Sequence, residues 1–218
     1  MPFPQIGILE IFEPLYIQFH DEEWGVPVRD DKKLFELLIL SQALTELTWP
    51  TILYNRETFR MMFEDFDPFS IAKYDEQKLR ALVQNGNMLS EPKLRAVVDN
   101  ARQFIKIQQE FHSFSNYCWR FVNNKQIKSG YRYARQVPAK TPKSELISKD
   151  LMRRGFRYVG PTIMYSFMQV AGLVNDHLSS CFRFSECDNH VKMDPNLKLV
   201  KTDGQAEATI NTCSSNDS

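Results

Sequence analysis

The chain has 218 residues, 43% of them hydrophobic, which is enough for one domain with a substantial core. Its 27 basic residues balance its 27 acidic residues, which excludes a global basic field that would draw the whole protein to nucleic acid. The four cysteines lack the spacing of a secreted disulfide framework, which favours a reducing intracellular setting. No apolar run has the length that crosses a membrane.

The first half of the chain predicts a series of helices. Asp30 and Asp31 are typical N-cap residues, and apolar residues recur behind them at helical spacing. Thr48 begins the next helix in the same way, with Pro50 in its first turn. In chain order, the expected helices begin at Asp30, Thr48 and Asp67 and then span 75–83, 92–111 and 115–122.

The second half predicts a basic loop and then two helices joined by a tight turn. Residues 125–141 have no clear period, and Pro138 and Pro142 interrupt them. The two helices are expected at 142–154 and 160–173. We therefore expect a domain over 14–187, an atypical N-terminal segment over 1–13 and a disordered polar tail over 188–218.

The turn between these two helices is bounded by Gly155 and Gly160. Glycine allows left-handed dihedrals and close approach of the backbone to a partner. A basic helix, a glycine-bounded turn and the free N–H groups of a second helix together form an anion site, and the natural anion is a nucleic-acid phosphate. The alternative is an ordinary corner between two helices of a core. The predicted DNA-contacting residues are Arg153, Arg154, Gly155, Arg157 and Gly160.

Basic residues are concentrated in this part of the chain. Ten Lys and Arg lie between Lys125 and Arg157, and only Glu145 and Asp150 oppose them. We expect this local excess to lie on the side of the hairpin, where phosphate contact would use it. The alternative is a solvated basic face that has no partner.

Six motifs stand out along the chain: PLYIQFHDEEWGVP at 14–27, KLFE at 33–36, LTW at 47–49, RRGFRYVG at 153–160, YSFMQ at 165–169 and GLVNDH at 172–177. Together they closely resemble the 3-methyladenine DNA glycosylase I family, and more narrowly its plant branch. The resemblance covers about residues 14–187. It implies an all-α, helix-hairpin-helix DNA repair glycosylase that cleaves the bond between N3-methylated adenine and deoxyribose in double-stranded DNA. It also implies a structural zinc that joins the two chain ends.

The resemblance assigns zinc ligands to His20, His177 and Cys181. Two thiolates and two imidazoles would complete a tetrahedral site, but Gly7 stands near the position of the family's N-terminal cysteine. The fourth ligand is then open between water, Cys187 and His190. A site with an open position is typical of catalytic zinc, whereas the family's zinc lies far from the base pocket.

The resemblance places the base pocket at Phe19, Trp24, Ser41 and Trp49. Two indoles can sandwich a flipped base, although they can also be plain core residues. The bacterial members carry a glutamate where this chain has Ser41 and commonly a tyrosine where it has Phe19. Glu46 is either a replacement carboxylate or a surface residue. The reaction class is therefore better defined than the lesion.

The leaving group dictates the mechanism that we expect. A base methylated at N3 is cationic, so the enzyme has mainly to flip the nucleotide, hold the base and let water attack. No lysine stands out as a nucleophile, which predicts a monofunctional glycosylase. Asp176 either orients water and stabilises the cation or has a structural role, by holding His177 or capping a turn. The predicted catalytic residues are Ser41, Trp49 and Asp176.

Two other functions stay open at this stage. One is a DNA-binding homologue whose altered pocket has lost catalysis, and the other is a helical protein–protein adaptor that reuses the scaffold. We expect a monomer that acts in the nucleus or an organelle without a clear targeting peptide.

Overall fold

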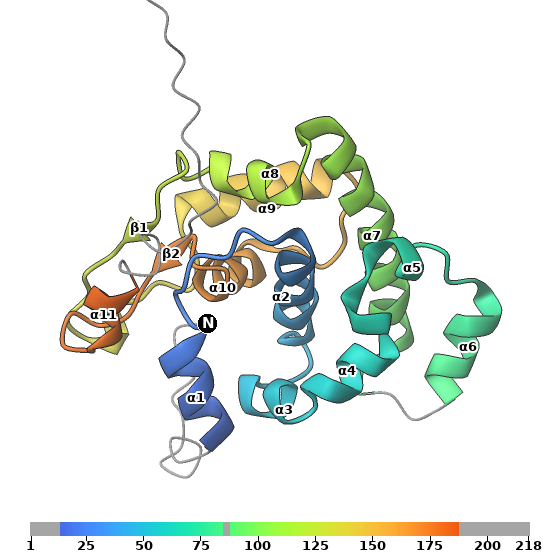
Figure 1. Ribbon diagram of the computed structural model, residues 1–218, viewed down its shortest axis with the longest axis horizontal. Helices are drawn as coiled ribbons and strands as arrows, with labels where there is room; N and C mark the ends of the chain where they lie inside the picture. Colours follow the sequence, from blue (N-terminus) through green and yellow to red (C-terminus); the bar gives the residue numbers. More distant parts are fainter. Residues whose placement is uncertain (1–13, 85–87, 188–218) are drawn as a thin grey trace, which may run out of the picture.

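The computed structural model describes residues 14–84 and 88–187 of the chain (Figure 1). The predictions for 1–13 and 188–218 lie outside these residues. The described elements are α1 (Pro14–Glu22), α2 (Asp31–Ala43), α3 (Trp49–Tyr54), α4 (Arg56–Met62), η1 (Glu64–Phe66), α5 (Pro68–Ile71), α6 (Glu76–Gln84), α7 (Glu91–Phe111), α8 (Phe114–Arg120), β1 (Ile127–Lys128), η2 (Ala134–Gln136), α9 (Pro142–Arg153), α10 (Pro161–Val170), β2 (Val174–Asn175) and α11 (Arg183–Glu186).

The predicted helix starts are confirmed by their caps. The side chain of Asp30 accepts a hydrogen bond from the backbone N–H of Lys33 at 2.7 Å, and Thr141 caps α9 through the N–H of Ser144. The single helix expected from Thr48 is in fact two, α3 and α4. The break falls at Asn55, whose side-chain amide donates to a carbonyl of the preceding turn and so competes with helix continuation.

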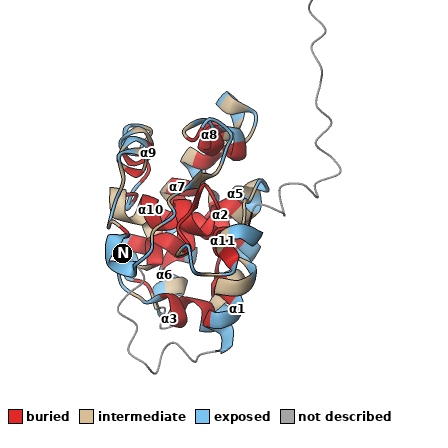
Figure 2. Ribbon diagram, turned by 90° about the vertical axis from the view of Figure 1, so that its left-hand side faces the viewer, coloured by how far each residue is buried: buried red, intermediate tan, exposed pale blue. Residues whose placement is uncertain are grey.

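Helix α2 is the centre of the fold. Ten of its 13 residues are buried, because α7, α8, α10 and η1 all pack against it. A helix covered on every side needs apolar residues all round, so its sequence shows more than the single apolar stripe of a surface helix. Figure 2 shows α2 and α10 as the most deeply buried helices, with α1 on the outside.

Within residues 14–84 and 88–187, the predicted all-helical class holds apart from one short pair of strands. Strands β1 and β2 pair in parallel, with Ile127 opposite Val174. The basic loop, residues 125–141, therefore has more structure than its sequence indicates, since it contains β1 and the single turn η2. Within the described residues no helix is both long enough and apolar enough to cross a membrane.

Candidate active site and metal group

Three aromatic rings from separate segments form a buried cluster. Phe19 lies on α1, Trp24 on the loop behind it and Trp49 at the start of α3, and each side chain is at most 4% exposed. The ring of Phe19 is tilted against that of Trp49 at 5.0 Å and meets Trp24 edge-on at 5.9 Å. The two indoles meet edge-on at 6.1 Å. Three of the four residues predicted to form the base pocket are thus in mutual contact.

The loop that carries Trp24 is fixed by the end of α10. Gly25 N–H donates to Gln169 O at 3.1 Å, and Val28 N–H donates to Ala171 O at the same distance. Gly172 has a φ of +66°, and a Cβ there would lie 2.3 Å from the backbone of Val26. Only glycine allows this approach, so Gly172 sets the position of the Trp24 loop.

An ion network that the sequence did not predict holds the same region from the other side. Arg56 on α4 donates two bonds to Glu23, at 2.6 and 2.9 Å, and one to Glu36 on α2 at 2.6 Å. Lys33 lies within 3.2 Å of both carboxylates. Burial alone would raise the pKa of Glu36, but the charges of Arg56 and Lys33 outweigh burial and lower that pKa. The network therefore ties α2 and α4 to the turn after α1, beside Trp24.

Ser41, the fourth predicted pocket residue, lies near the C-terminal end of α2. Its side chain is fully buried, and its hydroxyl donates to Leu37 O of the same helix at 2.7 Å. This internal bond occupies the hydroxyl proton, so Ser41 has no proton left for a base in this arrangement. Glu46 is exposed and accepts bonds from the N–H and hydroxyl of Ser90, which confirms the surface alternative for Glu46.

Asp176 is buried in a network of neutral donors. Its carboxylate accepts hydrogen bonds from the hydroxyls of Tyr165 and Ser129 and from the side-chain amide of Gln169, the last at 3.2 Å. The residue that holds His177 is a different one, Asn175, whose Oδ1 accepts from the backbone N–H of His177 and lies 3.1 Å from its Nδ1. Asp176 thus links α10, β2 and the basic loop.

The three predicted zinc ligands converge from opposite ends of the described chain. One donor atom each from His20, His177 and Cys181 lies within 4.8 Å of the other two. The Nε2 of His20 lies 3.7 Å from the Sγ of Cys181. Ligand atoms on tetrahedral zinc are roughly 3.3–3.7 Å apart, so a small contraction of the group would fit the ion.

The chemistry of the donors also fits a metal. The Nδ1 of His20 lies 2.8 Å from an oxygen of Asp21, and the Nδ1 of His177 faces Asn175, so both imidazoles present their Nε2 to the centre of the group. The Nε2 of His177 is buried and has no hydrogen-bond partner. Burial, with the neighbouring His20 next, lowers the pKa of His177 to about 4, so the imidazole is in the neutral form that binds metals.

Of the three candidates for a fourth ligand, the structure describes the position of Cys187. Its Sγ lies 4.0 Å from the Nδ1 of His177, the nitrogen that faces away from the group, and 3.8 Å from Trp24 O. Cys187 is therefore beside the group and outside it. His190 and Gly7 lie outside the described residues. Gly25 packs closely against the ring of His177, since a Cβ at Gly25 would lie 2.9 Å from that ring.

The turn between α9 and α10 is pinned to the core through its backbone. Arg157 N–H donates to Asn100 at 2.8 Å, and Arg157 O accepts from Asn100 at 3.0 Å and from Gln42 at 3.2 Å. Gly155 has a φ of +89°, as expected, while the left-handed residue nearer the end of the turn is Tyr158 at +55°. Gly160 has ordinary dihedrals and caps α10, and a Cβ there would meet nothing within 4 Å.

Most of the basic residues of the hairpin form ion pairs with acidic residues of the same protein. Arg154 donates to Glu110 at 2.6 and 3.1 Å and to Asp150 at 2.9 Å, and Arg157 donates to Asp99 at 3.1 Å. Arg153 is 75% exposed and pairs with Asp150 at 3.1 Å. The expected basic excess therefore does not lie mainly on the hairpin. Of the ten basic residues, the exposed cations that make no ion pair within residues 14–84 and 88–187 are Lys149 on α9 and, on the basic loop, Lys125, Arg132 and Arg135.

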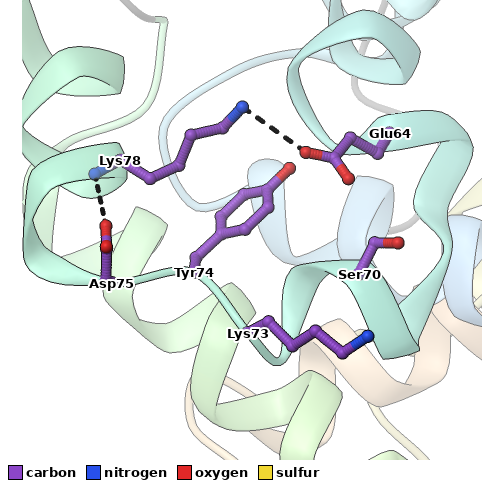
Figure 3. Close-up of a pocket in the computed structure, with 6 residues that line it drawn as sticks. All are labelled: Glu64, Ser70, Lys73, Tyr74, Asp75 and Lys78. Carbon is purple, nitrogen blue, oxygen red and sulfur yellow. Dashed lines mark hydrogen bonds and ion pairs between the residues drawn. The ribbon is translucent and has the colours of Figure 1, made fainter.

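A separate cavity of about 320 Å³ lies between η1, α5 and α6 (Figure 3). Its acidic and basic groups neutralise one another, since Lys78 pairs with Glu64 at 3.4 Å, and its tyrosine, Tyr74, donates to Met62 O. None of the predicted site residues lines it. The residues that line it are Glu64, Ser70, Lys73, Tyr74, Asp75 and Lys78.

Comparison with known proteins identifies the fold and its family. The family profile described as methyladenine glycosylase matches residues 10–184. DNA-3-methyladenine glycosylase 1 of Escherichia coli (strain K12) is 41% identical over 170 residues, 78% of this chain and 91% of the relative. The Haemophilus influenzae DNA-3-methyladenine glycosylase is also 41% identical over 170 residues, with 78% and 92% covered.

Solved structures agree with this assignment. A tyrosine-to-phenylalanine variant of 3-methyladenine DNA glycosylase I, in complex with 3-methyladenine, matches with a TM-score of 0.76. It is 36% identical, and the match covers 78% of this chain and 92% of that one. Together with the buried aromatic cluster and the α9–α10 hairpin, these matches show that the chain belongs to the methyladenine glycosylase family.

Proposed function

We infer that the protein is a monofunctional DNA glycosylase of base-excision repair, which hydrolyses the N-glycosidic bond of alkylated bases of the 3-methyladenine type. The observation that carries this conclusion is the buried contact between Phe19, Trp24 and Trp49 in a chain of the methyladenine glycosylase family. In this proposal the damaged base enters between these rings. Stacking on an aromatic side chain is worth roughly 1–3 kcal/mol per base.

The proposed site relies on the damaged base itself for most of its reactivity. A base methylated at N3 carries a positive charge and leaves as a neutral molecule, so departure requires no proton from the protein. The hydroxyl of Ser41 is used within α2, and Asp176 already accepts three hydrogen bonds. This supports a mechanism in which the protein flips and holds the base while water attacks the sugar. Undamaged adenine, which needs a proton to leave, is spared.

The hairpin is the proposed anchor for the duplex, as in a helix-hairpin-helix module. The backbone of Arg157 is fixed by Asn100 and Gln42, so the turn presents a rigid surface. The open space at Gly160 and the exposed side chain of Arg153 suit close approach of a phosphate. Arg154 and Arg157 are held by ion pairs within the protein. We therefore assign them two roles, to hold the hairpin in place and to contact DNA.

His20, His177 and Cys181 are the proposed holders of one structural zinc. The bound ion would link α1 to the segment after β2, in addition to the ring contacts that His20 makes with His177 and Phe182. Such an ion would supply cross-linking energy rather than chemistry, because none of its three ligands belongs to the aromatic cluster of Phe19, Trp24 and Trp49. The protein is expected to act as a monomer in the nucleus or an organelle.

The experiment that tests the function is a base-release assay. Duplex DNA treated with a methylating agent is incubated with the protein, and free 3-methyladenine, 7-methylguanine and adenine are separated by chromatography. We expect release of 3-methyladenine, with no strand cleavage. Absence of any released base, together with normal duplex binding, would instead favour the catalytically impaired homologue. Absence of both would favour the adaptor.

A further inference from the structure

The charge of this protein is distributed very unevenly along the chain. Although the net charge is zero, the 34 residues from 111 to 144 contain no Asp or Glu. They do contain seven basic residues, most of them in the basic loop. The seven are Arg120, Lys125, Lys128, Arg132, Arg135, Lys140 and Lys143.

Three of these cations are exposed and make no ion pair with any residue in 14–84 or 88–187. They are Lys125, Arg132 and Arg135. By contrast, Arg120 pairs with Asp150, and Lys140 pairs with Glu145. The basic loop therefore retains the uncompensated positive charge that the hairpin has largely lost.

The basic loop is held in a defined shape. Strand β1 pairs with β2, and Ser179 N–H donates to Tyr131 O at 2.8 Å. The amide oxygen of Gln136 accepts the backbone N–H groups of Arg132 and Tyr133 at 2.9 and 3.0 Å. A cationic surface that is already ordered loses less conformational entropy when it binds a partner.

Tyrosines alternate with arginines in this segment. Tyr133 is 56% exposed, and the guanidinium of Arg135 lies 5.1 Å from its ring centroid. Arginine makes bidentate bonds to phosphate, and tyrosine can bond to phosphate or sugar oxygens through its hydroxyl. This composition suits a polyanion with regularly spaced phosphates better than a carboxylate-bearing peptide.

The basic loop lies at the opposite end of α9 from the hairpin. Figure 1 shows the loop beside β1 and α11, whereas the α9–α10 connection lies beyond the other end of α9. The 12 residues of α9 span about 18 Å, which is the rise of about five base pairs of duplex. A duplex longer than this is therefore long enough to extend along α9 from one surface to the other.

We propose that Lys125, Arg132, Tyr133 and Arg135 form a second phosphate-contacting surface, which binds DNA outside the reach of the hairpin. This inference rests on the proposed function, since a DNA glycosylase supplies the duplex. The surface contributes affinity that does not depend on sequence or on the lesion, and it lengthens the footprint of the protein along the DNA.

The test is a salt titration of binding to an unmodified 25-base-pair duplex. A variant with Lys125→Gln, Arg132→Gln and Arg135→Gln is compared with a control that loses the same charge elsewhere, Lys32→Gln, Lys73→Gln and Lys106→Gln. Each lost phosphate contact lowers the slope of log K against log salt by about 0.9, so we expect a reduction of about 2–3 in the loop variant and none in the control. Melting temperatures of both variants show whether they are folded.

Duplex length gives a second readout. On a duplex too short to reach beyond the hairpin, the loop variant should bind like the wild type. If its slope and affinity on the long duplex equal those of the control variant, the inference is wrong, and it is equally wrong if the loop binds only an acidic peptide such as polyglutamate. Base release from methylated DNA by the wild type, measured in parallel, tests the proposed function independently of either result.

Discussion

The aromatic cluster and the metal group begin on adjacent residues of α1, yet they differ in polarity. Phe19 points into a closed apolar contact with two indoles, whereas His20 points into a polar group that contains an unsatisfied buried nitrogen. The first is complete without any ligand, and its rings must part to admit one. The second is a set of three donor atoms that fits a metal ion. A single helix thus carries one member of the proposed base site and one member of the proposed zinc site.

The difference predicts how each region responds to damage. Loss of a ring removes the stacking surface proposed for the base, and it also costs some packing energy because each ring is buried. Loss of a metal ligand removes a cross-link and leaves the rings in place. Activity and stability should therefore separate when the two regions are changed one at a time, and fall together when their shared support is changed.

The largest effect is expected from Gly172→Ala, which damages both regions at once. The added Cβ would lie 2.3 Å from Val26, and the φ of +66° is unfavourable for alanine. Strain and overpacking together should destabilise the protein by about 4 kcal/mol, measured by urea unfolding. Gly160→Ala is the matched control, since open space surrounds it, and its stability should change by less than about 0.5 kcal/mol. Equal stabilities for the two variants would contradict this role of Gly172.

Arg56→Met should be the next most damaging change, through the support of the Trp24 loop alone. The substitution leaves the buried carboxylate of Glu36 without its main partner, so the free energy of unfolding at pH 7 should fall by about 3 kcal/mol.

The pH dependence follows from the lowered pKa values of Glu23 and Glu36, which Arg56 and Lys33 produce against the opposing effect of burial. A lowered folded-state pKa gives stability that is present above the unfolded value of about 4.5 and is lost as pH falls through the folded value. The difference between wild type and Arg56→Met should therefore shrink below about pH 4.5. A difference that stays constant in acid would exclude this network as its origin.

Trp49→Leu should separate activity from stability within the aromatic cluster. Because the side chain is buried, some destabilisation is unavoidable, so the control is Phe104→Leu, at a buried ring on α7. At a temperature below both melting points, we expect base release to fall about 10- to 100-fold in Trp49→Leu only, which is the equivalent of one lost stacking contact. Comparable loss in both variants would assign Trp49 to the core alone.

Metal removal should give a moderate effect confined to stability. A chelator is expected to lower the melting temperature by about 4–8 °C, the shift for a loss of about 2 kcal/mol in a domain of this size. His177→Ala should show the lower melting temperature without any response to the chelator. His112→Asn, at an exposed left-handed position that asparagine also tolerates, should retain the response. Metal analysis that finds no zinc in the purified protein would contradict the assignment.

Changes at Ser41 should have the smallest effects. Ser41→Ala removes a hydroxyl that bonds only to its own helix, so base release should stay within about threefold of wild type. Ser41→Glu restores the carboxylate of the bacterial relatives and should raise the release of 3-methyladenine relative to 7-methylguanine, because a hydrogen-bonding pocket discriminates better than an apolar one. A change in melting temperature shows whether the longer side chain fits the buried position.

The sequence predicted which residues form the aromatic cluster and the metal group more fully than it predicted the residues that hold them in place. Capping residues and helix-breaking residues predicted the positions of most helices, because these signals act within four residues. The resemblance brought Phe19 and Trp49 together, and the spacing of His177 and Cys181 fitted one ion. The roles of these residues stay predictions, but their proximity is now established.

What the sequence could not predict depends on contacts between distant positions. Arg56 meets Glu23 across 33 residues, and Asn100 meets Arg157 across 57, and neither pair belongs to a periodic pattern. A glycine at the end of α10 does indicate a left-handed residue, but not that another backbone touches it. The error over the hairpin charges has the same origin, since Glu110 and Asp99, which neutralise Arg154 and Arg157, lie on α7.

The bond from Gly25 to Gln169 also has a consequence for synthesis on the ribosome. The two partners are more than 140 residues apart, so at typical elongation rates of 5–20 residues per second, about 7–30 s separate their appearance. During that interval the Trp24 loop has none of its α10 anchors. The newly made N-terminal part can pack α1 on α3, but neither the base site nor the metal group can close. Nascent chains stalled before α10 should therefore remain open to proteolysis around residues 24–28.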